Sequence, residues 1–356
     1  MTGGCALVTG SLGLVGAAAV RRLSDLGLTV HGVDADLRRQ FFGDAASTAP
    51  VRADLERACR SYRHHGFDIR DAAAVGGLVA RLGRDLAVVV HAAAQPSHDW
   101  AATDPATDFA INATATLTLL EACRTSAPQA LFLFMSTNKV YGDAPNLLPL
   151  RAEGTRLEPE STHRFHARGI DESMSIDQTR HSLFGVSKAA ADLMVQEYAA
   201  RFGMRTIVLR AGCLTGEAHR GTKAHGFLSF LCATARAGRT YEVIGHGGLQ
   251  VRDNLHADDL AEAFVAALTG SGGSGVYNIG GGRLGSCSVI EALAMAAEVL
   301  GRPVAQRFTE APRYGDHLWW ISDTGRFQQD HPGWRPRLSA RDLVERLLAE
   351  GQAQPA

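Results

Sequence analysis

Residues 5–16 read CALVTGSLGLVG and define how the fold begins. The apolar run 5–8 is typical of a buried strand, and the amphipathic stretch 15–26 predicts a helix. Between them, Gly10 permits a tight turn, Gly13 lets the backbone approach a pyrophosphate, and Gly16 allows close helix–strand packing. The helix start then offers N–H groups and a positive dipole end to phosphates. This order predicts a dinucleotide-binding site, although three glycines among 38 can also form a plain turn.

An acidic residue after the next predicted strand indicates which dinucleotide is bound. Asp34 ends the stretch LTVHGVD, within about 20 residues of the glycine turn, as expected for a carboxylate on the adenosine ribose. A carboxylate there repels a 2′-phosphate, which favours NAD over NADP. The same residue can be a helix cap, and the nearby Arg38 and Arg39 leave NADP open. Asp68 and Ile69 follow another predicted strand and are candidates for framing the adenine, or else a turn aspartate beside a core isoleucine.

Short apolar runs and helical patterns alternate along much of the chain. Strands are predicted at 28–34, 86–94, 130–137 and 205–212, and helices at 15–26, 110–125 and 187–202. This alternation predicts an α/β fold, a Rossmann doubly wound parallel sheet covered by helices on both faces. Past Arg210, glycine-rich stretches separate shorter elements. We therefore expect an NAD-binding domain over 1–209, with later returns near 250–280, and a mainly substrate-binding lobe over 210–356 at the carboxyl ends of the strands.

The composition is that of a soluble globular protein, and it argues against several classes. Of the 356 residues, 46% are hydrophobic and 21% are charged, with a formal net charge of -1. No basic tract predicts binding to nucleic acid or to an anionic membrane. The apolar runs are too short to span a bilayer, and the N-terminus lacks a signal-peptide plan. The six cysteines are scattered and the 14 histidines show no HExxH spacing, which predicts reduced thiols in a cytoplasmic protein without a metal site.

Several further strings resemble those of the extended short-chain dehydrogenase/reductases, which include nucleotide-sugar epimerases and dehydratases. They are the TGxxGxxG turn, HAAAQ (91–95), Asn112, STNKVYG (136–142) and GVSK (185–188). Within that superfamily, the chain is most similar to the CDP-paratose 2-epimerases, also called CDP-tyvelose epimerases. The strings that carry this likeness are RRQFFG (38–43), STNKVYGD (136–143), GIDESMSIDQ (169–178), VRDNLHADD (251–259), YNIGGG (277–282) and RYGDHLWWISD (313–323).

The resemblance implies a role for each matching position. Thr137 would bind the hydroxyl being oxidised, and Lys188 would hold the nicotinamide ribose. Asn138 and Lys139 stand where 4,6-dehydratases carry an Asp-Glu pair, and His181 is a further catalytic candidate. Cofactor contacts are implied for Gly10, Leu12, Gly13, Leu14, Val15, Ala92, Ala93, Asn112, Ser136 and Lys188. Substrate contacts are implied for Gln95, Ser97, Thr137, Asn138, Cys213, Arg252 and Arg313. The two arginines would grip the diphosphate with forked guanidinium groups, and the alternative is an ordinary ion pair, for example of Arg252 with Asp253.

One position departs from the superfamily signature YxxxK. The register HSLFGVSK puts Phe184 four residues before Lys188, and phenylalanine can neither take nor give a proton. Three explanations follow, in order of preference. Another group moves the proton, with Thr137, His181, Tyr141, Lys139 or a water as candidates; the substrate differs; or the chain binds NAD without turnover.

The residues favour the simpler of the two family reactions. A dehydratase needs an acid and a base to remove water, and the Asn138-Lys139 pair lacks those carboxylates. Epimerisation needs only one hydroxyl proton to move. The resemblance adds that the substrate is a nucleoside-diphosphate sugar inverted at carbon 2, so we expect NAD-dependent epimerisation at that carbon. The alternatives are a dehydratase or tailoring enzyme on an unusual sugar or nucleoside, and then a non-catalytic NAD-binding regulator. Trp319 and Trp320 line the nucleotide-base pocket or pack in the core. The helices over 110–125 and 187–202 resemble those that pair in superfamily homodimers, and the alternative is ordinary packing on the sheet.

Overall fold

A computed structural model describes residues 4–216, 226–310 and 315–349. Its largest sheet has seven strands in the order β3-β2-β1-β4-β5-β8-β12, and every neighbouring pair is parallel. The strand order runs outward from β1 in both directions, which confirms the predicted Rossmann fold. The strands are β1 (Cys5–Thr9), β2 (Thr29–Val33), β3 (Tyr62–His65), β4 (Leu86–His91), β5 (Leu131–Thr137), β8 (Thr206–Ala211) and β12 (Gly275–Ile279).

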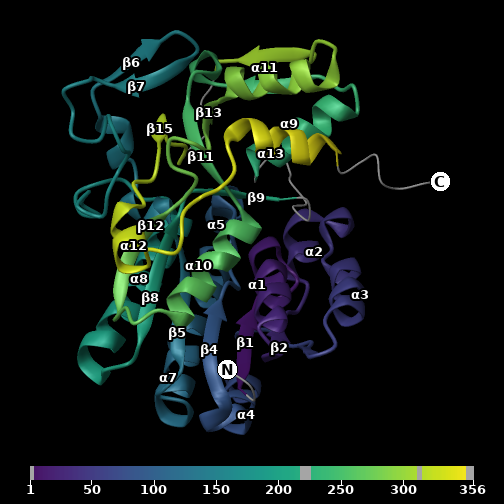
Figure 1. Cartoon of the computed structure of the whole chain (residues 1–356), viewed down its shortest axis with the longest axis vertical. Helices are drawn as coiled ribbons and strands as arrows, with labels where there is room; N and C mark the ends of the chain where they lie inside the picture. Colours follow the sequence, from purple (N-terminus) through teal and green to yellow (C-terminus); the bar gives the residue numbers. More distant parts are fainter. Residues whose placement is uncertain (1–3, 217–225, 311–314, 350–356) are drawn as a thin grey trace.

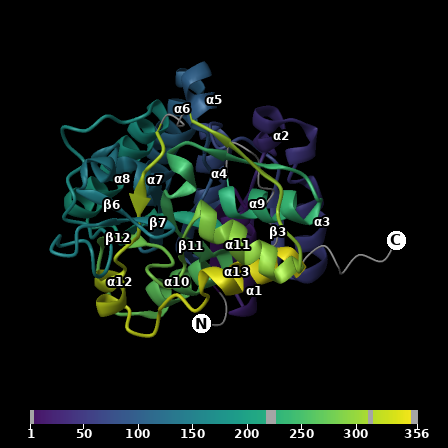
Figure 2. The same cartoon turned by 90° about the horizontal axis from the view of Figure 1, so that it is seen from above.

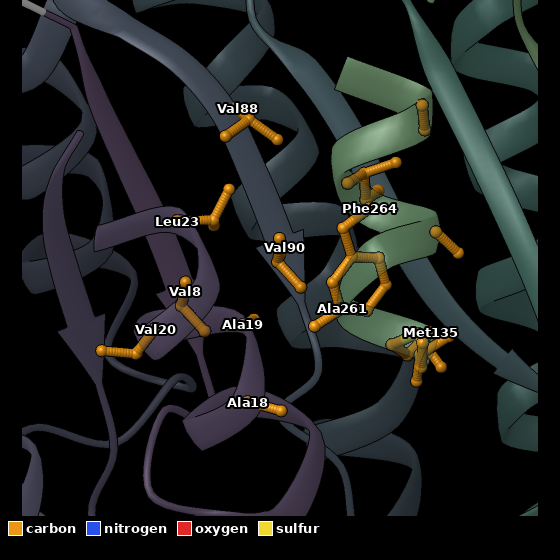
Figure 3. Packing of buried hydrophobic residues seen from close by; sticks show 14 of the residues in the cluster. Val8, Ala18, Ala19, Val20, Leu23, Val88, Val90, Met135, Ala261 and Phe264 are labelled. Atoms are coloured by element: carbon orange, nitrogen blue, oxygen red, sulfur yellow. The ribbon is translucent and has the colours of Figure 1, made fainter. Parts of the chain in front are cut away.

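Helices cover both faces of this sheet. One face carries α1 (Leu14–Asp25), α3 (Ala49–Ala58), α10 (Ala257–Thr269) and α12 (Gly325–Asp330), and the other carries α4 (Ala72–Leu82), α7 (Ala115–Ser126) and α8 (Leu183–Phe202). Figure 3 shows Val8, Val88 and Val90 of the strands among Leu23 of α1 and Phe264 of α10. Because apolar side chains pack on both faces, the central strands β1, β4 and β5 read as nearly continuous apolar runs.

The predicted helices differ from the observed ones mainly at their starts. Helix α8 begins at Leu183 instead of 187, because Ser182 caps it by accepting a hydrogen bond from Gly185 N at 3.1 Å. The predicted helix over 110–125 begins as a π-helical turn, Ala110–Thr114, and becomes α7 only afterwards. Shorter helices follow β2 and β4, namely α2 (Leu37–Phe42), α5 (His98–Thr103) and α6 (Pro105–Phe109).

A second lobe lies at the carboxyl ends of the parallel strands (Figure 1). Helices α9 (Phe227–Arg236), α11 (Val289–Leu300) and α13 (Ala340–Ala349) pack together there, as the view from above shows (Figure 2). Its strands are β10 (Tyr241–Ile244) with β14 (Gln306–Thr309), and β9 (Cys213–Thr215), β11 (Val251–His256), β13 (Ser286–Ser288) and β15 (Trp319–Trp320). The hairpin β6 (Leu150–Glu153) and β7 (Arg156–Pro159) joins it, because Leu157 N donates to Leu249 O at 2.8 Å.

The chain crosses between the two parts more than once. Hairpin β6–β7 belongs to the first 209 residues but packs on the second lobe. Helix α10 and strand β12 come after residue 209 but belong to the Rossmann domain. The division into 1–209 and 210–356 therefore stays a prediction about function, and the cleft described below takes residues from both parts.

Within the described ranges, no helix is both long enough and apolar enough to cross a bilayer. In the same ranges, no three His, Cys, Asp or Glu side chains are grouped so as to hold a metal ion. All six cysteines are free, and five of them are buried.

Candidate active site

A cleft runs along the carboxyl ends of the central strands, between them and the second lobe. The Rossmann side contributes the glycine turn, the end of β2 and the segments that follow β4 and β5. The second lobe contributes residues of β9, β10 and β11 and the segment around Asp316. The crevice beside β1 is where the strand order reverses direction, the usual ligand site of an open α/β sheet.

The glycine turn forms one end of this cleft and leaves no room for side chains at two of its positions. Gly10 has a φ of +66°, and a Cβ there would lie 2.8 Å from Ala93 N. A Cβ on Gly16 would lie only 2.0 Å from Gly10 O. Gly13 differs: its Cβ would meet only Gly10 O, at 3.4 Å, and the residue lines the cleft. The turn is therefore held tightly from behind, while its exposed backbone can approach a ligand.

Asp34 lies beside this turn at the end of β2 and lines the cleft. Its Oδ2 accepts a hydrogen bond from Leu12 N at 3.0 Å, and its Oδ1 accepts one from Asp36 N at 2.8 Å. Burial raises the pKa of the carboxyl group, and these two N–H donors oppose that shift. Because each carboxylate oxygen can accept a second hydrogen bond, the group remains able to bind both ribose hydroxyls.

Most of the other residues predicted to contact the dinucleotide line the cleft, and some lie behind its wall. Those that line the cleft are Gly10, Leu12, Gly13, Leu14, Val15, Ile69, Ala92, Ala93, Ser136 and Lys188. Asp68 is directed to Arg70, whose Nη2 donates to it at 2.6 Å. Two nearby arginines had kept NADP as an alternative to NAD. Arg38 lines the cleft, and Arg39 forms an ion pair with Asp44 on the surface. The backbone turn and Asp34 thus fit NAD.

Three residues that were predicted to contact a ligand are instead buried behind the cleft lining. They are Asn112, Gln95 and Ser97. Asn112 accepts a hydrogen bond from Gln95 N at 3.0 Å and donates to Ser187 Oγ at 3.1 Å. Gln95 Nε2 donates to Asp108 at 2.9 Å. These side chains join the segment after β4 to α6 and α8, so we propose that they position Ala92 and Ala93 without touching a ligand.

Lys188 belongs to α8, and its side chain lines the cleft. Its Nζ donates to Met135 O at 2.6 Å and lies 4.2 Å from the centre of the Phe134 ring. Burial lowers the pKa of the ammonium group to about 7, although Asp192 and Asp108 act in the opposite direction. Thr137, at the end of β5, lines the cleft as well, and its Oγ1 accepts a hydrogen bond from Lys139 N at 3.2 Å.

Phe184 lines the same part of the cleft, one helical turn before Lys188. Its ring meets the His98 ring edge-on, with the ring centres 5.2 Å apart. His98 lines the cleft too, and its Nδ1 lies 2.7 Å from Ser182 Oγ. His98 was not among the predicted site residues, because nothing near it in the chain indicates that it would meet α8.

Two candidates for the missing proton carrier lie outside the cleft lining. His181 Nε2 donates to Val140 O at 2.7 Å. Tyr141 is fully buried and donates to Asn278 Oδ1 at 2.8 Å, and burial raises the pKa of its phenol to about 12. Trp319 and Trp320 are also fully buried, in a cluster with Tyr141, and do not line the cleft.

Two cationic side chains lie at the end of the cleft towards the second lobe, which also contains the carboxylates of Asp316 and Glu242. Arg252 of β11 and Lys139 both line it, together with Asn138 and Cys213. Arg252 Nη2 lies 3.7 Å from Asp316 Oδ1, so its ion pair is not with the adjacent Asp253. Arg313 lies outside the described residues.

Lys139 and Cys213 both have shifted pKa values at this end of the cleft. Lys139 Nζ donates to Gly315 O at 2.9 Å. Burial lowers the pKa of this ammonium group to about 8, an effect that Asp316 opposes and Arg252 reinforces. Burial also raises the pKa of the Cys213 thiol to about 11, so this thiol stays protonated at neutral pH.

Residues 6–280 match the model of the NAD dependent epimerase/dehydratase family. The chain belongs to this family. The match spans the glycine turn, Asp34, Thr137, Lys188 and Arg252. It confirms the likeness to the extended short-chain dehydrogenase/reductases, and it confirms NAD as the cofactor of the family.

Individual relatives include both reaction types. The chain is 31% identical to CDP-paratose 2-epimerase of Salmonella typhi over 291 residues, 80% of this chain and 82% of that protein. It is 30% identical to dTDP-glucose 4,6-dehydratase of Shigella flexneri over 292 residues, 77% and 71% of the two chains. The solved structure of MoeE5 in complex with UDP-glucuronic acid and NAD has a TM-score of 0.73 and 26% identity, with 98% and 99% of the chains covered. UDP-glucose 4-epimerase of Thermus thermophilus in complex with NAD shares the fold, with a TM-score of 0.76, 24% identity and the same coverage.

Proposed function

We propose that this protein epimerises a nucleoside-diphosphate sugar at carbon 2, by oxidising it transiently to a keto sugar and returning hydride to the opposite face. The observation that carries the proposal is the composition of the central cleft. Thr137 and Lys188 stand between the glycine turn and the cationic end formed by Arg252 and Lys139, and the 138–139 positions hold no carboxylate.

The residues of the chain divide the work along the cleft. NAD, when bound, accepts the hydride and gives it back. Asp34 holds the adenosine ribose, and Lys188, kept in place by Met135 O, holds the nicotinamide ribose. Thr137 orients the sugar hydroxyl, and Arg252 binds the diphosphate with the help of Lys139. Two cationic side chains close together can bind phosphate oxygens through charge-assisted hydrogen bonds.

The cleft favours epimerisation over loss of water. A dehydratase must remove a carbon-bound proton and protonate a leaving hydroxyl, which calls for an acid and a base close to the sugar. Among the described residues that line the cleft, the carboxylates are Asp34, Glu242 and Asp316, and none neighbours Thr137 in sequence. Asp34 lies at the ribose end, and Asp316 faces Arg252. The similarity to a CDP-paratose 2-epimerase supports carbon 2 as the position that is inverted.

A dehydratase or a tailoring enzyme on an unusual sugar or nucleoside is the second candidate, supported by the likeness to dTDP-glucose 4,6-dehydratase. A non-catalytic NAD-binding regulator is the third. It accounts for Phe184, but a regulator has no need of Thr137, Lys188 and Arg252 in one cleft.

We also propose that the protein acts as a homodimer. Several large apolar side chains are exposed on α7 and α8, two helices that pack against each other on one face of the sheet. They are Leu117 (39% exposed), Leu183 (46%), Val186 (45%), Leu193 (50%) and Phe202 (49%). Exposed apolar side chains on neighbouring helices are typical of a protein–protein contact.

The test is to incubate the purified protein with a panel of nucleotide sugars in deuterated water and to follow them by NMR and mass spectrometry. Direct oxidation inverts a carbon without uptake of deuterium. Deuterium uptake or loss of water would contradict the epimerase and favour the dehydratase. No change in any sugar, with NAD bound, would favour the regulator.

A further inference from the structure

The corner of the cleft at Phe184 contains a titratable side chain that the YxxxK signature does not account for. Phe184 is 7% exposed, and its ring occupies the position of the superfamily tyrosine in the register HSLFGVSK. The His98 ring packs edge-on against it with an interplanar angle of 73°. Both rings line the cleft that also contains Thr137 and Lys188. An imidazole therefore lies beside the position that carries tyrosine in the superfamily signature.

His98 is fixed to the helix that carries Phe184 and Lys188. Its Nδ1 lies 2.7 Å from Ser182 Oγ, and the same oxygen accepts a hydrogen bond from Gly185 N at the start of α8. This contact orients the imidazole relative to the start of α8. An imidazole takes up and releases a proton near neutral pH, which suits a group that must do both within one catalytic cycle.

The segment 315–317 passes over the same corner and fixes its surroundings. A Cβ on Gly315 would lie 2.8 Å from His98 Nδ1, so the absence of a side chain lets the backbone approach the ring. This segment carries two titratable side chains, Asp316, which faces Arg252, and His317. His317 is fully buried, and its Nε2 donates to Gly142 O at 2.8 Å. Burial holds the pKa of His317 well below its usual range, and Lys139 and Arg252 add to the effect. His317 therefore stays neutral.

The other cleft-lining candidates are less suited to the task. The Thr137 hydroxyl does not ionise near neutral pH. It can orient a substrate hydroxyl, but it cannot take up and hold the proton that this hydroxyl releases. Lys139 Nζ is directed to Gly315 O, and the groups that influence it electrostatically are Asp316, Arg252 and Cys213 at the diphosphate end. Among the described side chains, His98 combines a titratable group, a place in the cleft lining and contact with Phe184.

We propose that His98 is the catalytic residue that carries the proton of the sugar hydroxyl in place of the missing tyrosine. In the forward step the O–H bond breaks and its proton moves to His98, while the C–H electron pair leaves as hydride to the cofactor and the C=O bond forms. In the return step hydride adds to the opposite face of the carbon and His98 gives the proton back to oxygen. The product is an isomer of the substrate, and no further reactant is consumed. This assignment rests on the proposed function, because it needs a sugar hydroxyl to be oxidised in the cleft.

The first measurement compares wild type, His98→Asn and the double variant His98→Asn/Phe184→Tyr with the sugar identified in deuterated water. An asparagine amide can keep the contact with Ser182 but cannot titrate. The expected loss in kcat for His98→Asn is about 10²- to 10⁴-fold, with KM changed by less than about threefold. In the double variant the phenol restores a proton carrier beside Lys188, and kcat should recover by at least about tenfold. A control outside the cleft lining, His163→Gln, should behave as wild type.

Two outcomes would overturn the assignment: an unchanged kcat in His98→Asn, or a loss that Phe184→Tyr does not relieve. The second would show that His98 only supports the start of α8, since a new phenol cannot repair a misplaced helix. Thermal unfolding of each variant separates that case from a failure to fold.

A readout that needs no turnover distinguishes failure of this assignment from failure of the proposed function. The holoenzyme is labelled with ¹⁵N-histidine, and the ring signals of His98 are assigned from their loss in His98→Asn. Saturating CDP-glucose, with binding measured by calorimetry, should shift those signals. If bound CDP-glucose leaves the His98 signals unmoved, the assignment is wrong, whether or not any sugar turns over. If the signals shift but no sugar of the panel is converted, it is the proposed function that fails.

Discussion

The glycine turn allows a prediction whose size follows from the structure. An alanine Cβ at Gly16 would lie 2.0 Å from Gly10 O and 2.7 Å from Ser11 Cα. Comfortable contacts between such atoms are about 3.5 Å, so α1 must move by roughly 1.5 Å or the turn must open. Overpacking of this kind costs typically 1–3 kcal/mol, and backbone atoms on the far side place Gly16→Ala at the upper end. We expect a fall in Tm of roughly 4 °C.

Two other glycines serve as matched controls in the same assay. Gly13 has a φ of -74° and its Cβ would meet only Gly10 O, at 3.4 Å, so Gly13→Ala should fold normally. Its methyl group would occupy the face of the turn that meets the pyrophosphate, so NAD affinity should fall at least about tenfold, or 1.4 kcal/mol. Gly76, in α4, has nothing within 4 Å of its Cβ, and Gly76→Ala should stabilise the protein by about 0.5–1 kcal/mol.

The assay is thermal unfolding of the three apo variants together with calorimetric titration of NAD. If Gly16→Ala were as stable as wild type, the close approach of α1 to β1 would not be a constraint. If Gly13→Ala bound NAD normally, the exposed face of the turn would not be the pyrophosphate site.

Three further changes test other parts of the molecule. Asp34→Asn should weaken the binding of NAD by about 1.5–3 kcal/mol, because a charged acceptor is lost, and should weaken the binding of NADP less. Calorimetric titration of both cofactors measures this difference. An equal loss for both would count against Asp34 as the residue that discriminates between them. Burial lowers the pKa of Lys188 to about 7 from 10.5, so the unfolded chain binds one more proton between those values and stability rises with pH across that window. Lys188→Met should flatten this rise in denaturant unfolding at pH 7 and pH 9, and an unchanged slope would refute the shift. Leu193→Asp places a charge on an exposed apolar residue of α8 and should shift the protein from dimer to monomer in light scattering, whereas Arg52→Ala on α3 should not.

Part of the candidate site could be read from the sequence because it depends on neighbours in the chain. The glycine turn and Asp34 belong to one strand–helix–strand unit, so their spacing alone brings them together. Thr137 ends β5, and parallel strands end at one edge of the sheet. The loss of a proton carrier at Phe184 is a chemical fact of the side chain and needs no fold.

The parts that sequence reasoning could not supply depend on which distant element a side chain meets. His181 was a reasonable candidate by its position before Lys188, but in the folded chain its ring turns to Val140 O. Asn112 and Gln95 carry polar groups in motif positions, yet they hydrogen-bond to each other beneath the cleft wall. Periodicity reports which face of an element is buried, and it does not report the partner of a polar group on that face.

The sequence by itself determined the Rossmann sheet, the dinucleotide turn, the acidic residue beside it and the vacancy in the YxxxK signature, because each follows from local backbone needs or from side-chain chemistry. Only the tertiary structure decided which side chains surround Phe184, the position that lacks the tyrosine. His98 meets Ser182 across 84 positions of the chain, and Lys139 meets Gly315 across 176. Contacts of that range form when helices and lobes pack against the ends of the strands, and packing is a property of the whole fold that no single stretch of sequence contains.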